Sequence, residues 1–373
     1  MAATSFERVF PGDVISKRER VERTLNLLPV DRVALHEQLS YNPGVISLYT
    51  GKDCSGFRYT LHDIGVVVSQ TMDACFPPIA PQGRARVIDE DGFVVQFDDW
   101  TSWTVARPFR DVAGAREYLL RRTERLLQAP FDAQQERERF HRHMRSLQGL
   151  VGETVIIDYS IEVGFCNCWS KLGLELFTYL CHEDLQVVSD YIEVVTNANV
   201  RRLHAIADAS LSPVVLIAED FASKGGPIFS PAFLRKEHFP RVRRLTEAWH
   251  SHGIKVLYHS DGNWKSVIPD LVACGVDGFY CLEPSLGMDI VELRNAWPKH
   301  VWAGGLDGVD LMERGRPEEV KREVHRQILE TDALNRSGIF IDSSSEINPP
   351  IKPENFRAMV EAVGEVFNPQ FVL

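Results

Sequence analysis

The chain has 373 residues, of which 44% are hydrophobic and 25% charged, and its net charge is −11. This composition is typical of a globular protein with a large core. The acidic balance argues against a nucleic-acid surface, which needs a basic face. No apolar run approaches the roughly 18 residues of a membrane helix, and the N-terminus lacks the pattern of a signal peptide. Seven cysteines do not suggest a disulfide framework, so we expect a cytoplasmic protein with reduced thiols.

The first 150 residues give irregular signals. A one-sided apolar pattern predicts a helix over 16–28, and residues 31–35 then form a strand that leads to His36 and Glu37. Residues 85–104 alternate apolar and polar side chains around the turn at Gly92, which predicts a β-hairpin. Its aromatic residues either pack or wall a substrate pocket; they are Phe93, Phe97, Trp100 and Trp103. The run 136–145 interleaves charges of both signs and indicates the solvated face of a helix.

From about residue 151, strand and helix signals alternate. Strands are predicted over 154–157, 213–218, 254–258, 278–282, 301–303 and 338–341. Helices are predicted over 169–180, 186–208, 231–252, 264–274, 318–330 and 353–366. Apolar strands separated by helices indicate an α/β protein with a parallel sheet, and the lack of a dinucleotide fingerprint favours a closed barrel. We expect one (β/α)8 TIM barrel domain over 1–373, with an irregular N-terminal part and hairpin over 1–150 and regular units over 151–373.

The most informative segment is 255–263, an apolar strand that ends in His259 and Asp261 and turns at Gly262. Because side chains alternate along a strand, His259 and Asp261 point the same way. In a barrel they lie at the C-terminal mouth, where such folds hold their active sites. The segment therefore predicts a metal or acid/base site; a turn whose Asp begins the next helix is the alternative.

Other polar residues follow the predicted strands and meet at the same mouth. They are His36, Glu37, Glu219, Asp220, Glu283, Asp307 and the segment 343–346, which ends in Glu346. This concentration of His, Glu and Asp fits either a divalent metal or general acid/base chemistry.

Catalytic zinc takes three protein ligands and leaves one position open. The most economical set is Glu219, Glu237 and His259, and in an alternative set Asp261 or Cys281 replaces one of them. A surface carboxylate on the helix 231–252 is the competing interpretation of Glu237, and an acid at the start of a loop is that of Glu219.

Four segments carry a family resemblance: 28–33 (Leu-Pro-Val-Asp-Arg-Val), 258–263 (Tyr-His-Ser-Asp-Gly-Asn), 304–307 (Gly-Gly-Leu-Asp) and 347–356 (Ile-Asn-Pro-Pro-Ile-Lys-Pro-Glu-Asn-Phe). Together with further matches between residues 17 and 366, they resemble the uroporphyrinogen decarboxylase superfamily. The resemblance implies a single (β/α)8 barrel with its site at the C-terminal mouth.

Two departures separate this chain from the decarboxylases of that superfamily. Decarboxylases carry an arginine-containing stretch for substrate carboxylates where this chain has residues 36–41 without arginine, and a late-loop histidine where it has residues 343–346 (Ser-Ser-Ser-Glu). The thiol and methanol methyltransferases carry a His-x-Cys motif and a later Cys, whereas this chain has His259-Ser-Asp261 and serines. The aryl-ether O-demethylase branch has two Glu and then a His as zinc ligands, and Glu219, Glu237 and His259 follow that order with slightly different gaps.

The resemblance therefore implies a zinc-dependent, corrinoid-linked methyltransferase. It would cleave a methyl ether, in the simplest case of a methoxylated aromatic (O-demethylation), and pass the methyl group to cob(I)alamin. Zinc would act as a Lewis acid that makes the departing oxide a better leaving group. Candidate proton donors or zinc-positioning residues are Asp261, Asp307 and Glu346, and candidate substrate contacts are His36, Trp100 and Phe165.

Partners follow from the same hypothesis. No segment resembles a fused cobalamin-binding domain, so the acceptor is expected to be a separate corrinoid protein or free cobalamin. We expect a small-molecule methyl donor that the sequence does not identify, no nucleic acid and no membrane, and the superfamily suggests a homodimer. The rival functions are a decarboxylase of similar fold and a non-catalytic barrel that only binds a corrinoid or its carrier.

Overall fold

The computed structural model describes residues 10–371. Eight parallel strands form one sheet in which spatial neighbours follow chain order: β1 (Ala34–Glu37), β2 (Ala74–Cys75), β6 (Val155–Ile156), β7 (Val214–Ala218), β10 (Lys255–His259), β11 (Gly278–Tyr280), β12 (Val301–Leu306) and β13 (Ile339–Ser343). β13 pairs with β1, and a parallel bridge between Asp158 and Val215 joins the chain after β6 to β7. The sheet therefore closes on itself, and the expected (β/α)8 barrel is confirmed.

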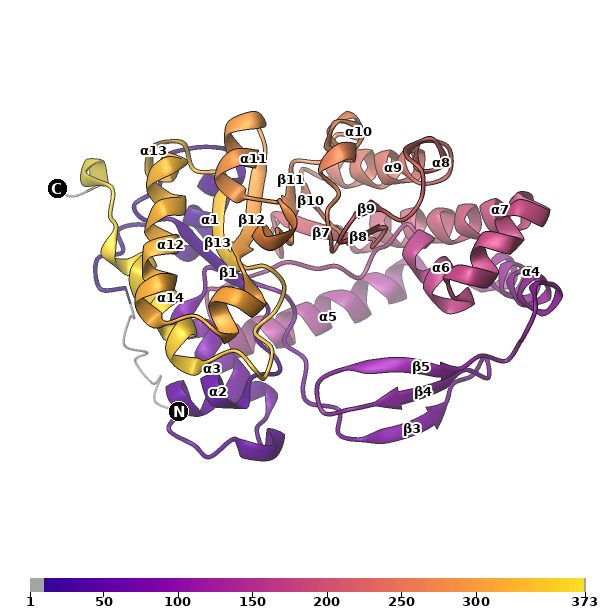
Figure 1. The fold of residues 1–373 in the computed structure, drawn as a ribbon, viewed down its shortest axis with the longest axis horizontal. Coiled ribbons are helices and arrows are strands. Elements are labelled where there is room, and N and C mark those ends of the chain that lie inside the picture. The colour runs from indigo at the N-terminus through magenta and orange to yellow at the C-terminus, as the bar shows by residue number, and fades with distance from the viewer. Residues whose placement is uncertain (1–9, 372–373) are drawn as a thin grey trace.

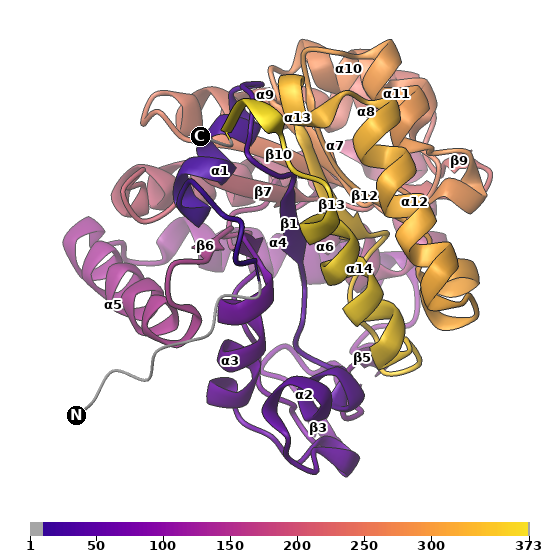
Figure 2. The ribbon, with the colours of Figure 1, turned by 90° about the vertical axis from the view of Figure 1, so that its left-hand side faces the viewer.

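Helices surround the strands, as Figure 2 shows for α3, α5, α9, α12 and α14. The helices are α1 (Lys17–Leu25), α2 (Pro43–Thr50), α3 (Leu61–Thr71), α4 (Val112–Gln128), α5 (Ala133–Val151), α6 (Phe165–Leu172), α7 (Leu174–Ile206), α8 (Pro231–Glu237), α9 (Phe239–His250), α10 (Ile268–Ala273), α11 (Ile290–Ala296), α12 (Pro317–Glu330), α13 (Ala333–Arg336) and α14 (Pro353–Glu365). Short helical turns complete the chain: η1 (Ser55–Phe57), η2 (Lys265–Val267), η3 (Pro284–Leu286), η4 (Gly308–Glu313) and η5 (Pro369–Phe371). Within residues 10–371, no helix combines the length and apolar character needed to cross a bilayer.

Alternation along the strands produces two hydrophobic layers. Leu216, Leu257 and Phe340 belong to an inner cluster, whereas Val256 and Tyr258 belong to the layer between strands and helices. Val21 and Leu25 of α1 join the inner cluster. Since α1 precedes the first strand, it closes the N-terminal end of the barrel and leaves the opposite end for the site.

A small antiparallel sheet follows β2 and therefore belongs to the mouth side of the barrel. Its strands are β3 (Ala85–Ile88), β4 (Val94–Phe97) and β5 (Ser102–Ala106). The expected hairpin is present as β3 and β4, and β5 adds a third strand. A two-stranded ribbon, β8 (Ala222–Ser223) with β9 (Gly226–Pro227), follows β7. In Figure 1 the three-stranded sheet stands off from the barrel, below β8 and α6.

Two predicted helix boundaries are wrong. The separate helices expected over 169–180 and 186–208 are α6 and then one long α7, which is kinked at Asp184 (φ −152°, ψ 72°). The helix expected over 231–252 is split into α8 and α9 at His238. Pro240 explains the split, because it lacks the backbone N–H that a continuous helix would need at that position.

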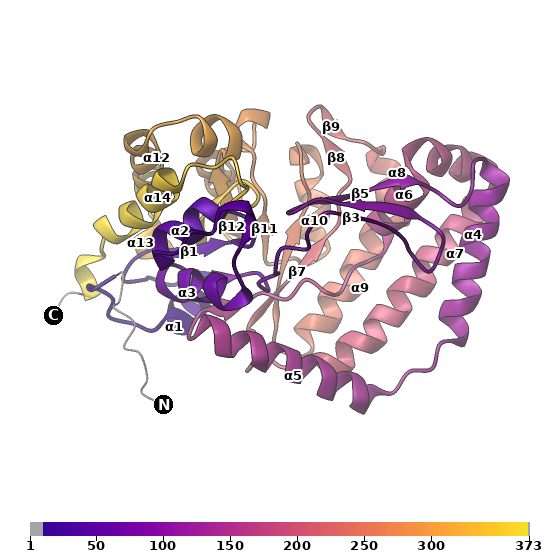
Figure 3. The same ribbon diagram turned by 90° about the horizontal axis from the view of Figure 1, so that it is seen from below.

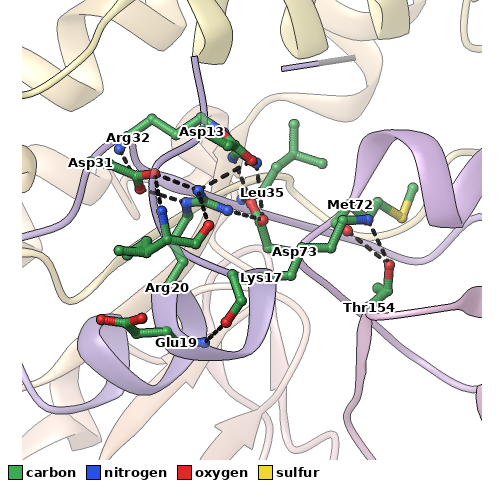
Figure 4. Close-up of polar contacts among 12 residues, drawn as sticks. Asp13, Lys17, Glu19, Arg20, Asp31, Arg32, Leu35, Met72, Asp73 and Thr154 are labelled. Carbon is green, nitrogen blue, oxygen red and sulfur yellow. Dashed lines mark hydrogen bonds and ion pairs between the residues drawn. The ribbon is translucent and has the colours of Figure 1, made fainter. Parts of the chain in front are cut away.

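A buried ion-pair network lies beside α1 and the starts of β1 and β2 (Figure 4). Arg20 donates to Asp31 at 2.6 Å and to Asp73 at 2.8 Å, and Arg32 donates to Asp73 at 2.7 Å and to Asp13 at 2.6 Å. The side chains of Arg20, Arg32, Asp31 and Asp73 are fully buried. Burial alone would raise the pKa of Asp73, but Arg32 and Arg20 outweigh burial and hold that pKa well below its ordinary value.

We predict that Asp73→Asn strongly destabilises the fold. The substitution leaves Arg20 and Arg32 as buried charges without their shared carboxylate, which costs about 3–5 kcal/mol in comparable buried pairs. Urea unfolding measures the loss. Asp310→Asn is the matched control, because Asp310 pairs with Arg314 at 3.0 Å on an exposed surface and should leave the midpoint nearly unchanged. Equal shifts in both variants would contradict the role given to the network.

The same network predicts acid sensitivity. Asp31 and Asp73 have pKa values held below those of an unfolded chain. Their contribution to stability is therefore complete above about pH 4, the ordinary aspartate value, and is lost as the pH falls toward their folded values. Unfolding free energies measured between about pH 6 and pH 3 should fall less steeply for Asp73→Asn than for the wild type.

Candidate functional site

A small cavity opens at the C-terminal mouth of the barrel. Its volume is about 210 Å³, and its lining residues lie in or follow seven of the eight strands: Gln38, Phe76, Tyr159, Leu216, Ala218, His259, Asp261, Tyr280, Ser345 and Glu346. No lysine or arginine belongs to this lining. The volume lies below the range of roughly 300–1,000 Å³ that is common for drug-sized ligands, so the cavity suits a small molecule.

Three side chains of the types that bind metals converge beside this cavity, and two of them, His259 and Asp261, line it. His259 and Asp261 come from the end of β10 and Cys281 follows β11, and their ligand atoms all lie within 4.8 Å of one another. Cys281 Sγ lies 3.1 Å from Asp261 Oδ1, and His259 Nε2 lies 3.7 Å from the same oxygen. Asp220, after β7, adds a fourth donor, with Oδ1 3.4 Å from His259 Nε2.

The backbone conformation of Cys281 and the pKa shifts of His259 and Cys281 are unusual. Cys281 has φ +70°, a left-handed conformation that costs a non-glycine residue on the order of 1 kcal/mol. Burial alone would lower the pKa of His259, but Asp220 and Asp261 outweigh burial and raise it. Burial and Asp261 raise the pKa of the Cys281 thiol well above its ordinary value. A negative potential therefore surrounds the imidazole, and it favours a bound cation, which in turn favours the thiolate.

The spacing of these donors fits zinc. Ligand atoms of a tetrahedral zinc ion with bonds of about 2.0–2.3 Å lie roughly 3.3–3.8 Å apart. The separations of 3.1, 3.4 and 3.7 Å are close to this range, and the ligand atoms of His259 and Cys281 lie within 4.8 Å of each other. Imidazole, thiolate and carboxylate are also the ligand types that zinc takes in proteins. The residues present therefore fit a zinc ion.

The structure does not bring Glu219 and Glu237 together with His259. The Glu219 carboxylate is buried and accepts the backbone N–H groups of Gly164 at 2.8 Å and Cys166 at 2.6 Å, at the start of α6. Glu237 lies on α8 beside Arg241, with 3.5 Å between Oε2 and Nη1. Across residues 10–371, the one group of three converging metal-type ligands is His259, Asp261 and Cys281. The alternative set has Asp261 or Cys281 replace one ligand, whereas in this group they stand in place of both glutamates.

The remaining predicted catalytic residues lie in different places. Asp261 and Glu346 line the cavity, and burial and Asp261 raise the pKa of Glu346. Asp307 instead accepts the backbone N–H groups of Val309 at 3.0 Å and Asp310 at 2.7 Å, and so begins the turn η4. Two of the three carboxylates therefore face the cavity, and the third stabilises a loop beside it.

None of the three predicted substrate contacts lines the cavity. His36 is buried directly beneath it, with its ring 4.6 Å from Phe76 and 5.4 Å from Tyr280, and its Nδ1 contacts Asp342. Phe165 is fully buried among the aromatic side chains near α6, α7 and α8. Trp100 lies, partly buried, between β4 and β5.

Sequence reasoning missed the aromatic walls of the cavity. Phe76, Tyr159 and Tyr280 pack edge to face, with ring centroids 5.4 Å apart for Phe76 and Tyr159 and 5.1 Å apart for Phe76 and Tyr280. Tyr280 is the last residue of β11, and a search for aromatic residues at predicted strand ends would have found it. Phe76 follows β2, a strand of two residues that no periodicity reveals.

Glu219 gives a prediction that tests its placement. Burial and Glu162 raise its pKa to about 8, above the ordinary glutamate value, so the folded protein binds a proton there that the unfolded chain releases. Stability should therefore fall as the pH rises from about 5 to about 8. Glu219→Gln removes this titration, and its unfolding free energy should fall less over that range than that of the wild type. Parallel curves would contradict the placement.

Two comparisons with known proteins bear on this geometry. A family model described as "Uroporphyrinogen decarboxylase (URO-D)" matches residues 169–366, more than half of the chain. A solved structure described as "methyltransferase from Methanosarcina mazei" superposes with a TM-score of 0.65 at 16% identity, covering 94% of this chain and 99% of that one. At this identity the likeness shows the fold. No significant match was found among curated proteins.

Proposed function

Because this chain belongs to the uroporphyrinogen decarboxylase family, we propose that it is a zinc-dependent methyltransferase of that family. The proposed reaction takes a methyl group from a methyl ether, in the simplest case a methoxylated aromatic, and gives it to cob(I)alamin on a corrinoid protein. The fold likeness to a methyltransferase supports this proposal. The observation that carries it is the convergence of His259, Asp261 and Cys281 beside a small cavity that His259 and Asp261 line.

His259, Asp261 and Cys281 would hold the zinc ion, with Asp220 beside them. When bound, zinc supplies Lewis-acid stabilisation of the negative charge that develops on the departing oxygen. Asp220 positions this group from the neighbouring strand. Its Oδ1 accepts the backbone N–H of Asp261 at 2.9 Å and faces His259 Nε2, and so fixes where two of the three ligands point.

The other cavity residues bind the donor and supply a proton. Phe76, Tyr159 and Tyr280 present aromatic rings to the cavity, and such rings favour stacked or edge-to-face contact with an aromatic donor. Glu346 lines the same cavity, and its raised pKa keeps its carboxyl protonated to a higher pH than an ordinary glutamate. This carboxyl is therefore suited to hold a proton for the departing oxygen.

The charge of the cavity favours this reaction over porphyrinogen decarboxylation. A substrate with many carboxylates needs arginine or lysine partners. The lining has neither, and it carries Asp261 and Glu346. A neutral methyl ether meets no electrostatic penalty there.

The zinc content of the purified protein tests the ligand set. We expect about one zinc ion per chain in the wild type by mass spectrometry, and loss of zinc in His259→Ala and in Cys281→Ala. Glu237→Gln is the control, because Glu237 lies on α8 beside Arg241 and its variant should keep the metal. Loss of zinc in Glu237→Gln with retention in Cys281→Ala would contradict this set and favour Glu237 as a ligand.

Activity tests the reaction itself. With a methoxyarene as donor and reduced free cobalamin as acceptor, methyl transfer is followed by the absorbance change of the corrinoid. Glu346→Gln should lower the rate about 10²-fold, the usual contribution of one general acid, without loss of zinc. Release of carbon dioxide from a carboxylate substrate by metal-free protein, with no methyl transfer, would reverse the assignment in favour of a decarboxylase.

A further inference from the structure

A histidine and an aspartate lie next to each other inside the barrel. Ala34 on β1 pairs with Phe340 on β13, and both belong to the inner cluster. Because side chains alternate along a strand, His36 and Asp342, two residues further along, point inward as well. Figure 3 shows β1 near α14, the helix that follows β13. Barrel interiors are packed mainly with branched apolar residues, so a polar pair in this position calls for a function.

The pair is buried, and each member has one polar atom without a partner. His36 is 2% exposed and Asp342 is fully buried. His36 Nδ1 contacts Asp342 Oδ2, whereas His36 Nε2 and Asp342 Oδ1 have no hydrogen-bond partner among the described residues. A buried polar atom without a partner destabilises the folded state. Both atoms are therefore suited to a polar group that a ligand brings.

Aromatic rings place the unpaired nitrogen beneath the cavity. The His36 ring packs edge to face against Phe76 and Tyr280, with centroids 4.6 and 5.4 Å away, and both of these residues line the cavity. Gln38, the next residue on the same side of β1, lines it too. His259 of the proposed zinc site lies 5.4 Å from the Tyr280 ring. The two imidazole rings are therefore at most twice this distance apart, and a one-ring donor with two oxygen substituents spans such a gap.

The pair has acid groups around it and no cation. Glu37 is fully buried and accepts the backbone N–H and the hydroxyl of Ser343, each at 3.0 Å. Across the described residues, neither His36, Glu37 nor Asp342 pairs with a lysine or arginine. Burial lowers the pKa of His36 to about 4 and raises the pKa of both carboxyls well above their ordinary values. The imidazole is therefore uncharged at neutral pH, and a ligand carboxylate would find no counter-charge here.

We infer that His36 selects the methyl donor, because its Nε2 hydrogen-bonds a hydroxyl group of that donor. Asp342 holds the imidazole in place through Nδ1. A hydroxyl both donates and accepts, so it satisfies Nε2 in either tautomer of the ring, whereas a carboxylate or an ether oxygen only accepts. This role rests on the proposed methyl transfer, and it narrows the donor to an uncharged methoxyphenol as opposed to a methoxybenzoate.

The binding of three matched ligands tests this role. Each is a 4-methoxyphenyl ring, and the group opposite the ether is a hydroxyl, a methyl or a carboxylate: 4-methoxyphenol, 4-methoxytoluene and 4-methoxybenzoate. In calorimetric titrations we expect the wild type to bind the phenol about tenfold more tightly than the toluene, the usual effect of one buried hydrogen bond, and the benzoate most weakly. Equal affinities for the phenol and the toluene, or tightest binding of the benzoate, would overturn the proposal.

Two variants of His36 identify the atom responsible. Asparagine can keep a polar atom near the Nδ1 position, and so the contact with Asp342, but it has none at the Nε2 position. His36→Asn should therefore lose the preference for the phenol and keep its zinc, and His36→Gln, which can place a polar atom near the Nε2 position, should recover part of the preference. His250→Asn is the matched control, because His250 pairs with Asp277 at 2.7 Å at an exposed position. A preference that persists in His36→Asn would contradict the role of Nε2.

Histidine ¹⁵N resonances of the wild type give a readout that does not depend on the stability of a variant. The phenol should shift a resonance of one imidazole that does not titrate near neutral pH, and the toluene should not. The absence of such a shift would also overturn the proposal. None of these measurements involves methyl transfer. A preference for the phenol without turnover would retain the role of His36 in binding and remove the proposed reaction, whereas turnover without the preference would do the reverse.

Discussion

Two buried arginines connect the first helix of the barrel to its first two strands. Arg20 on α1 and Arg32 before β1 both pair with Asp73, the residue before β2, and each also pairs with a second aspartate. One carboxylate therefore fixes a helix and two strands at once. Asp73 also accepts the backbone N–H of Leu35 at 2.9 Å, so β1 starts in register with its neighbour. The segment 28–33, which carries part of the family resemblance, supplies Asp31 and Arg32 to this network.

The ion-pair network stabilises the N-terminal end of the barrel, and the candidate site lies at the opposite end. Charges at the N-terminal end are paired and serve stability, whereas at the mouth Asp220, Asp261 and Glu346 surround one imidazole without a lysine or arginine in the lining. Like charges gathered without a balancing cation repel one another, and active sites accept that cost because it prepares them for a ligand of opposite sign. The left-handed backbone conformation of Cys281 is a second unfavourable contribution to the folding free energy at this site.

Sequence alone predicted the barrel because long apolar strands and amphipathic helices repeat after residue 151, and it predicted His259 and Asp261 because alternation puts them on one face. It grouped Glu219 and Glu237 with His259 because of their order along the chain. That order does not show in which direction a side chain points. Glu219 bonds the start of α6, and Glu237 faces Arg241. Cys281 was named only as a replacement, since its position depends on a backbone turn. β2 was missed because two residues show no period.

The ring of strand ladders in the barrel is interrupted at one position. Its neighbouring strands share ladders all the way round except between β6 and β7, where the described residues show one bridge, Asp158 with Val215. Opening one bridge costs less than separating a ladder, so amide exchange at this seam should be faster than at the other strand pairs. Tyr159 and Ala218, on the two sides of the seam, both line the cavity. The two cavity walls on either side of the seam are therefore joined by a single bridge, whereas the other walls are joined by strand ladders.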